Sequence, residues 1–391
     1  VIDLDFIKNI FVIRRIDSSA KDPREVSYDE LLRGGVKEVS SVYESTDPLI
    51  GLHVGYEEDF KPITHPAGGY LVQVYSTTKW IGLRPRDTYF CTVWPGWITA
   101  YSYVFFGPLM IGSTIIMYEG GPDHPTWERW LEILENYSVT LFLTTSGALR
   151  FLRRNVPEPL KKYRLDTLRA ILTTAEPLEV DTWYWAYRYV GTGSRSIITS
   201  DPGELSGRIP VINLYIQSEI GTFATGNLVN YLFPQILPGS AGPPIPGFHV
   251  DVVDQRGESV VNKIGRLIIR KPWPSTPIEA PEEFHRNWLE GYYDTGDLAI
   301  MNSEKYIIPL GRRDDVLKIS GYRISPGAIE KMIKRYFGEK ISRIEIIKKP
   351  DELRFEVPIV LIEGKVDPDN IKRIIREKLS AIAEPRDIVV R

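Results

Sequence analysis

The sequence is poor in cysteine, with Cys91 the only one among its 391 residues. A single thiol excludes an internal disulfide and is typical of a reducing compartment, so we expect a cytoplasmic protein. Cys91 stands in the apolar segment 88–94. We therefore expect it to be a small buried hydrophobic residue, not a reactive one.

Long hydrophobic runs and a strong net charge are also absent. No apolar stretch reaches the roughly 18–20 residues of a membrane span, and Val1–Leu4 does not begin a signal peptide. A formal net charge of −3 provides no general attraction to nucleic acids or anionic membranes. The expected ligands are therefore small molecules held by local Arg or Lys side chains.

The hydrophobic content of 43% is enough for a large core. At about 150 residues per domain, the length predicts two or three domains. Strands alternate with helices over residues 1–238, which predicts an α/β domain with a mainly parallel sheet covered by helices. The predicted strands are 89–94, 113–118, 140–144, 170–173 and 211–215, and the predicted helices are 68–81, 107–111, 125–136, 148–154 and 182–190.

The pattern changes near Gly239, where glycine and proline become dense. The short alternating runs 249–253, 266–269, 298–301 and 306–308 predict an antiparallel β-rich subdomain over residues 239–313. A small α+β domain is expected over residues 314–391. It would begin with a hairpin at 316–324 and a helix with Ser325 as N-cap and Pro326 in the first turn.

Charged residues and glycines recur at fixed offsets between Gly291 and Glu330. Asp297, after Thr-Gly, is suited to accept hydrogen bonds from two adjacent hydroxyls such as those of ribose. Arg312 offers a guanidinium fork for ribose or phosphate. Taken alone, an Asp in this setting is more often a turn residue.

Together, the run Thr295-Gly296-Asp297, the run 311–315 and the run 321–323 resemble the signature of the AMP-forming acyl-CoA synthetases, within the adenylate-forming family. The resemblance implies that a carboxylate and ATP form an acyl adenylate, from which coenzyme A takes the acyl group. It also implies a large N-terminal domain of parallel sheets with a β-barrel-like subdomain, followed by a small mobile C-terminal domain that swings about Asp314.

Two further segments match this family. Residues 213–221 resemble its aromatic-x-Thr-Glu motif with serine for threonine, and residues 174–177 resemble its Gly-Glu-Pro adenine turn with alanine for glycine. The implied catalytic residues are Ser218, Glu219, Arg312 and Arg323, with Glu219 also the Mg²⁺ ligand. The implied nucleotide- and CoA-binding residues are Ala175, Glu176, Pro177, Tyr215, Gln217, Asp297, Arg312 and Gly321.

The segment 96–102 resembles the acyl-pocket lining of acetyl-CoA synthetases. The implied pocket residues are Ile98, Thr99, Thr174 and Ile216. Acetate-specific members carry a tryptophan at the position of Ile216, so the smaller side chain predicts an acid longer than acetate. The alternative is that Ile216 simply packs in the core.

The phosphate loop of the family departs most in this chain. Where the family has small polar residues before a lysine, this chain has Glu57, Glu58 and Asp59 before Lys61. Each acid within about 4 Å of a phosphate charge costs about 1 kcal/mol even in bulk water. The sequence therefore predicts impaired binding of the ATP triphosphate.

Two hypotheses follow. The first is an acid–CoA ligase that uses ATP, Mg²⁺ and coenzyme A. The second is a catalytically impaired paralogue or subunit that keeps an adenylate- or CoA-sized pocket. The family's N-terminal portion precedes the position of Val1 and its C-terminal catalytic lysine follows that of Arg391. A homo-oligomer, or a partner chain supplying the N-terminal portion, is thus a further expectation.

Overall fold

The computed structural model describes residues 10–12, 23–33, 42–54, 61–191, 209–229, 235–289, 291–313, 317–320, 322–324 and 326–391. Its contacts divide the chain into two units, Val1–Tyr43 and Glu44–Arg391. In the first unit, strand β1 (Ile10–Val12) pairs in parallel with β2 (Glu25–Ser27), and the short helix α1 (Tyr28–Arg33) follows.

The second unit contains a five-stranded parallel sheet in the order β6-β5-β7-β8-β9. Its strands are β5 (Thr88–Cys91), β6 (Thr114–Ile116), β7 (Leu141–Thr145), β8 (Ala170–Thr174) and β9 (Val211–Asn213). The central strands β7 and β8 are buried almost throughout, as expected for a parallel sheet covered on both faces. The predicted α/β architecture is confirmed.

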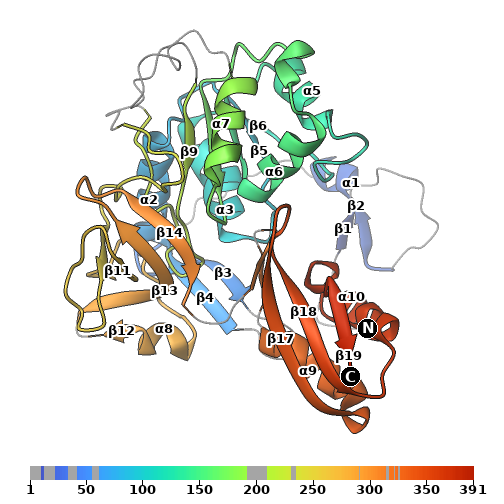
Figure 1. The fold of residues 1–391 in the computed structure, drawn as a ribbon. Helices are drawn as coiled ribbons and strands as arrows, with labels where there is room; N and C mark the ends of the chain where they lie inside the picture. Colours follow the sequence, from blue (N-terminus) through green and yellow to red (C-terminus); the bar gives the residue numbers. More distant parts are fainter. Residues whose placement is uncertain are drawn as a thin grey trace. The chain divides into compact units, whose positions relative to one another are not determined.

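Helices follow the strands of this sheet. They are α5 (Arg129–Asn136), α6 (Ser146–Asn155) and α7 (Val180–Tyr189). Figure 1 shows α6 and α7 side by side in front of the sheet. Cys91 is buried in the core of this region, where desolvation raises the pKa of its thiol to about 12, so it is an inert core residue as predicted.

A second group of helices precedes β6. Helix α2 (Ala67–Trp80) packs on a continuous helical stretch formed by α3 (Ile98–Ala100), the π-helical turn Tyr101–Phe106 and α4 (Gly107–Ile111). Only residues 107–111 of this stretch were predicted to be helical. Gly107 allows the close packing, because a Cβ there would lie 2.2 Å from the Thr78 hydroxyl.

Residues 249–312 form an antiparallel sheet with its own hydrophobic core. Its elements are β10 (His249–Val253), β11 (Ile264–Arg270), α8 (Glu282–Arg286), β12 (Trp288–Leu289), β13 (Tyr292–Met301) and β14 (Ile307–Arg312). Asp297, for which the local sequence alone favours a turn, lies inside the ten-residue β13, directly opposite Arg312 on β14.

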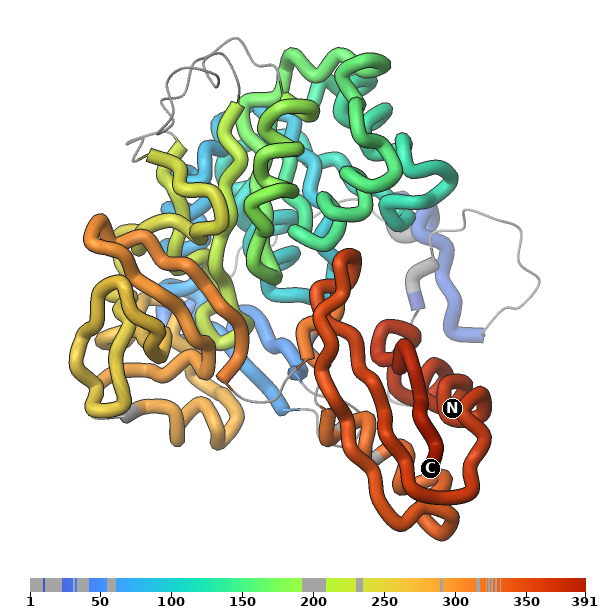
Figure 2. The backbone as a smooth tube through the Cα atoms, in the orientation of Figure 1, coloured from blue at the N-terminus to red at the C-terminus, as the bar shows by residue number. Residues whose placement is uncertain are grey.

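The last sheet has the order β16-β15-β18-β17, with β19 parallel to β18. Its elements are β15 (Leu317–Ile319), β16 (Tyr322–Ile324), α9 (Pro326–Phe337), β17 (Ile341–Asp351), β18 (Phe355–Gly364), α10 (Pro368–Lys378) and β19 (Asp387–Val390). Strands β17 and β18 form the long red hairpin in Figure 2. A separate hydrophobic cluster that includes Leu317, Ile333 and Val360 lies between this sheet and its helices. The predicted domain boundaries at residues 238 and 313 remain predictions.

Strands β3 (Pro48–Val54) and β4 (Lys61–Pro66) pair with each other in an antiparallel arrangement. The acids of the altered phosphate loop, Glu57 to Asp59, fall between them and outside the described residues. Three-residue 3₁₀ turns occur at Pro159–Lys161, Gly338–Lys340 and Ala381–Ala383. In the part of the chain that the structure describes, no helix has the length and apolar character needed to cross a bilayer.

Candidate functional site

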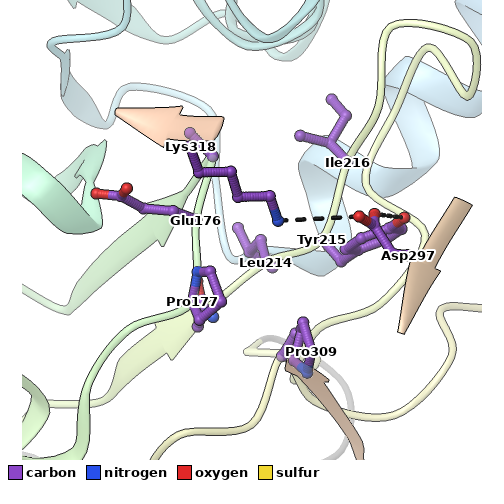
Figure 3. A pocket seen from close by; sticks show the side chains of 11 residues that line it. Glu176, Pro177, Leu214, Tyr215, Ile216, Asp297, Pro309 and Lys318 are labelled. Carbon is purple, nitrogen blue, oxygen red and sulfur yellow. Dashed lines mark hydrogen bonds and ion pairs between the residues drawn. The ribbon is translucent and has the colours of Figure 1, made fainter. Parts of the chain in front are cut away.

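A pocket opens at the carboxyl ends of strands β8 and β9. Ligands of open α/β sheets bind at this edge, because the loops that leave the strands gather there. The pocket encloses about 330 Å³ including its open mouth. It is lined by Ala175, Glu176, Pro177, Asn213, Leu214, Tyr215, Ile216, Ala241, Asp297, Pro309 and Lys318 (Figure 3).

Asp297 is the buried polar centre of this pocket, with only 1% of the residue exposed. Its Oδ2 accepts a 2.6 Å hydrogen bond from the Tyr215 hydroxyl and a 3.0 Å bond from Nε2 of Gln217. Gln217 also donates to the carbonyl of Thr295 at 3.0 Å. The two side chains from the loop after β9 therefore fix the rotamer of a carboxylate on β13.

Two cations lie on the other side of this carboxylate. Oδ1 of Asp297 is 3.9 Å from Nζ of Lys318 and 4.0 Å from Nε of Arg312. Both distances exceed those of hydrogen bonds, so the attraction is Coulombic. Arg312 is positioned by donating to the Thr295 carbonyl at 2.8 Å. Gly296 makes room for it, since a Cβ there would lie 2.6 Å from the guanidinium.

The predicted adenine turn forms one wall of the pocket. Ala175 has a φ of 79°, a left-handed conformation that glycine adopts without strain and alanine does not. This backbone conformation explains why the family has glycine at this position. Glu176 faces away from the cations near Asp297 and forms a buried ion pair with Arg150 of α6. Its carbonyl accepts a 3.0 Å hydrogen bond from Ser146.

Ser218 and Glu219 lie outside the pocket lining, on the loop that follows Gln217. The buried ring of His65 fixes this loop. Its Nε2 is 2.8 Å from the Ser218 carbonyl and its Nδ1 is 2.7 Å from the Ser275 carbonyl. Burial lowers the pKa of His65, while the two carbonyls oppose this shift.

The buried Oε2 of Glu219 has no hydrogen-bond partner among the described residues. An open carboxylate oxygen is what Mg²⁺ uses when one protein carboxylate and substrate phosphates share the ion. In the described ranges, no group of three or more His, Cys, Asp or Glu side chains could hold a metal without such help.

Of the four predicted acyl-pocket residues, only Ile216 lines the pocket. Ile98 is buried in a small cluster with Tyr70 and Val74, and Ile216 packs against this cluster. Thr99 and Thr174 are buried, and Thr174 donates a 3.1 Å hydrogen bond to the carbonyl of Leu214. Ile216 therefore lies between the pocket and the core, which is compatible with both interpretations of this residue.

The hairpin of β15 and β16 reaches this site. It carries Lys318 into the pocket, and the ring of Tyr322 packs edge-on against Trp97 with centroids 4.8 Å apart. Trp97 directly precedes Ile98 of the predicted acyl segment. Gly321, Asp314 and the side chain of Arg323 lie outside the described residues.

The structure thus brings together Ala175, Glu176, Pro177, Tyr215, Gln217, Asp297 and Arg312. Two further residues had no role assigned from the sequence. Lys318 belongs to the recognised motif but was not expected in the pocket, and the motif itself was the available signal. Arg150 lies on a helix far from any motif, and nothing in its local sequence marks it.

Comparisons with known proteins identify the family. The profile of the AMP-binding enzyme family matches residues 61–276, more than half of the chain. An acetyl-coenzyme A synthetase of Pyrobaculum aerophilum is 35% identical over 84% of this chain and 49% of its own length. One from Pyrobaculum arsenaticum is 33% identical over 98% of this chain and 58% of its own length. The chain therefore spans about half to three fifths of these relatives.

A solved structure supports the fold independently. The o-succinylbenzoate CoA synthetase of Bacillus subtilis, bound to a product analogue, superposes with a TM-score of 0.75. It covers 94% of this chain and 71% of that protein at 15% identity. The chain therefore belongs to the AMP-binding enzyme family and, within it, to the AMP-forming acyl-CoA synthetases.

Proposed function

We propose that this chain carries the adenylate site of an acid–CoA ligase that converts a carboxylate, ATP and coenzyme A into acyl-CoA, AMP and pyrophosphate. The observation that carries the proposal is the buried carboxylate of Asp297, fixed by Tyr215 and Gln217 and flanked by two cations. Such a group accepts hydrogen bonds from a ribose diol, while the cations beside it stabilise a phosphate charge.

Each pocket residue has a role in this proposal. Asp297 binds the ribose hydroxyls, and Tyr215 flanks the adenine together with the turn Ala175–Pro177. Arg312 and Lys318 hold the α-phosphate side of the adenylate. Positioning and charge stabilisation would supply most of the catalysis, as in other phosphoryl and acyl transfers.

Glu219 is the proposed Mg²⁺ ligand, with Ser218 beside it. The ion would neutralise phosphate charge on the nucleotide. The open Oε2 of Glu219 supports this assignment. Within the protein, the role of His65 is to hold the Ser218 carbonyl, and through it the loop that carries this carboxylate.

The acyl group would lie against Ile216. A branched aliphatic side chain leaves more space than a tryptophan, so we propose an acid longer than acetate. Coenzyme A would approach along the β15–β16 hairpin. The packing of Tyr322 on Trp97, next to the predicted acyl segment, supports this approach. Arg323, Gly321 and the hinge at Asp314 keep the roles that the resemblance implies.

A specific observation favours a second candidate, a paralogue or subunit that binds an adenylate without forming it. The acids Glu57 to Asp59 take the sequence positions at which the family's phosphate loop has small polar residues. Lys61, the remaining cation of this loop, forms a 3.2 Å ion pair with Glu283. A homo-oligomer, or a partner chain that supplies the relatives' N-terminal portion, and a cytoplasmic location complete the proposal.

Two measurements separate the candidates. Pyrophosphate release is followed with acids of increasing chain length in the presence of Mg-ATP and coenzyme A. Release with at least one acid supports the ligase, and no release with any acid counts against it. Calorimetry with AMP, coenzyme A and Mg-ATP then tests the second candidate. AMP or CoA binding without ATP binding supports it, and tight Mg-ATP binding excludes it.

A further inference from the structure

Arg150 on α6 makes polar contacts in two directions, although only 5% of its side chain is exposed. Toward the pocket, its guanidinium forms ion pairs with Glu176 and Glu179. Away from the pocket, its Nε donates a 3.3 Å hydrogen bond to the carbonyl of Leu353, and its plane lies over the ring of Phe355 at 5.8 Å. One buried side chain thus joins two segments some 180 residues apart.

The first segment is the turn that forms the pocket wall. Glu176 lies between Ala175 and Pro177, both of which line the pocket, and its side chain is fully buried. Glu179 begins α7. Two carboxylates facing one guanidinium would leave a buried charge uncompensated if the guanidinium were removed. The position of the pocket wall therefore depends on Arg150.

The second segment is the tip of the β17–β18 hairpin, residues 351–355, drawn in red in Figure 2. Two hydrogen bonds stabilise this turn, since Oδ1 of Asp351 accepts from the amides of Leu353 and Arg354 at 2.9 and 2.8 Å. The backbone amides of those residues and the Leu353 carbonyl that contacts Arg150 are therefore held in one arrangement.

The tip is also joined to the hairpin that enters the pocket. The amide of Ser320 donates to the Arg354 carbonyl at 2.8 Å, and Ile319 pairs with Phe355. The amide of Lys318 donates to Glu356 at 2.7 Å. A movement of the tip therefore moves Lys318, whose side chain lies beside Asp297.

Gly147 allows helix α6 to lie close to the pocket turn and to the β15–β16 hairpin. It lies one turn before Arg150 on the same helix. A Cβ there would come within 2.7 Å of Glu176 Oε1 and 3.7 Å of the Ser320 backbone. The helix, the pocket turn and the β15–β16 hairpin therefore meet at one place, with Arg150 next to it.

We propose that Arg150 is a positioning residue that latches the β17–β18 tip, and with it the Lys318 hairpin, onto the wall of the nucleotide pocket. Its planar fork serves both segments at once, which the single ammonium of a lysine does not. The consequence is reciprocal: a ligand that orders the turn Ala175–Pro177 strengthens docking of the tip, and docking of the tip favours the ligand. This second part rests on the proposed function.

Docking is measured by thiol labelling of Leu353→Cys. The hydrogen bond from Arg150 goes to the backbone carbonyl of residue 353, so the substitution keeps it. The native Cys91 is fully buried with a pKa raised to about 12, so it stays unlabelled in the folded protein. We expect Arg150→Lys to raise the labelling rate of the new thiol by about tenfold, because the tip opens more often. The matched control is Arg153→Lys on the same helix, whose exposed ion pair with Asp181 touches neither segment, and it leaves the rate unchanged.

A second variant keeps the test decisive if Arg150→Lys fails to fold, as judged by circular dichroism. Phe355→Leu removes the ring beneath the guanidinium and leaves Glu176 untouched. It should raise the labelling rate by about threefold, and the double variant should label no faster than Arg150→Lys alone, because both changes break one contact. Labelling rates equal to that of the parent protein in both single variants would overturn the latch.

The effect of AMP on the labelling rate distinguishes a positioning role of Arg150 from a purely structural one. In the Leu353→Cys protein, saturating AMP should slow labelling, and in the Arg150→Lys background it should have no effect. An equal effect of AMP in both backgrounds overturns the coupling. Calorimetry on the same samples distinguishes the two proposals: if AMP does not bind the parent protein, the proposed function fails, while the nucleotide-free rates still decide whether the latch exists.

Discussion

The chain gathers positive charge around Asp297 and negative charge before Lys61. In the pocket, Arg312 and Lys318 lie on one side of a carboxylate whose rotamer is fixed by two hydrogen bonds. In the altered phosphate loop, three consecutive acids replace the small polar residues of the family, and the adjoining lysine is engaged by Glu283. Under the proposed function, the first region would bind a nucleoside monophosphate and the second would oppose a triphosphate.

This difference separates two parts of the chemistry that the family usually carries together. In the proposed function, the pocket between β8, β9 and β13 would bind the adenosine and its first phosphate. The loop would bind and release pyrophosphate. A chain that keeps the first and alters the second can hold an adenylate more readily than it can make one. The following substitutions test this contrast, from the largest expected effect to the smallest.

Asp297→Asn should weaken nucleotide binding in the pocket. The amide keeps the shape but removes the charge that Tyr215, Gln217 and a ribose diol would bond. Hydrogen bonds to a charged group contribute about 1.5–3 kcal/mol, so AMP binding should weaken by about 10- to 150-fold in calorimetry. Glu258→Gln, an exposed acid on another turn, is the control. Unchanged AMP affinity in the Asp297 variant would contradict its role.

Neutralising the acids of the altered phosphate loop should change the affinity for ATP and not that for AMP. In Glu57→Gln/Glu58→Gln/Asp59→Asn, up to three repulsive pairs of about 1 kcal/mol each disappear. The affinity for Mg-ATP should rise by up to about 100-fold, whereas the affinity for AMP should stay the same. A protein with the three exposed acids Glu258, Glu339 and Asp369 neutralised controls for net charge. An equal gain in Mg-ATP affinity in the control would show a general charge effect. It would contradict the inference that the loop acids oppose ATP binding.

Lys318→Met tests whether the hairpin cation serves the pocket. It removes one of the two positive charges near Asp297 and keeps a long apolar stem. AMP should bind about tenfold more weakly, corresponding to about 1.4 kcal/mol. Lys340→Met, on an exposed turn, should bind AMP like the parent protein. Loss of affinity in both variants would point to net charge and not to position.

Ile216→Trp tests the acyl side of the pocket. The larger ring should shift the preference in pyrophosphate release toward acetate by about tenfold, the usual discrimination for one or two methylene groups. Ile216→Leu keeps the volume and should leave the preference unchanged. If the tryptophan variant kept the parent's order of acids, Ile216 would be a core residue with no role in selection.

Ala175→Gly should have the smallest effect. With φ at 79°, alanine is strained by about 1–2 kcal/mol. Glycine removes this strain, but the greater conformational entropy of its unfolded chain offsets part of the gain. The free energy of unfolding in urea should rise by about 0.5 kcal/mol. Ala148→Gly, in helix α6, is the matched control and should lower it by about 1 kcal/mol. A destabilised Ala175→Gly would mean that the methyl group packs favourably in the turn.

The alternation of apolar runs predicted most strands and helices of the second unit, because burial on both faces leaves a nearly continuous hydrophobic pattern in β7 and β8. Where local signals compete, the prediction was incomplete. The helical stretch from Ile98 through the π-helical turn to Phe106 contains aromatic residues with no helical preference, and tertiary packing on α2 decides its form. Thr-Gly-Asp taken alone is typical of turns, yet pairing with β14 keeps Asp297 inside β13.

The sequence alone indicated which residues the candidate site would contain. Asp297, Arg312, Tyr215 and the turn at residues 175–177 could be named because their types and spacing form a recognisable motif, and the three acids at residues 57–59 could be weighed by charge alone. Tertiary structure decided which residues meet. Lys318 in the pocket and Arg150 between the pocket wall and the β17–β18 tip have no local signature, because a contact between segments far apart in the chain depends on how the sheets pack and not on the residues that flank them.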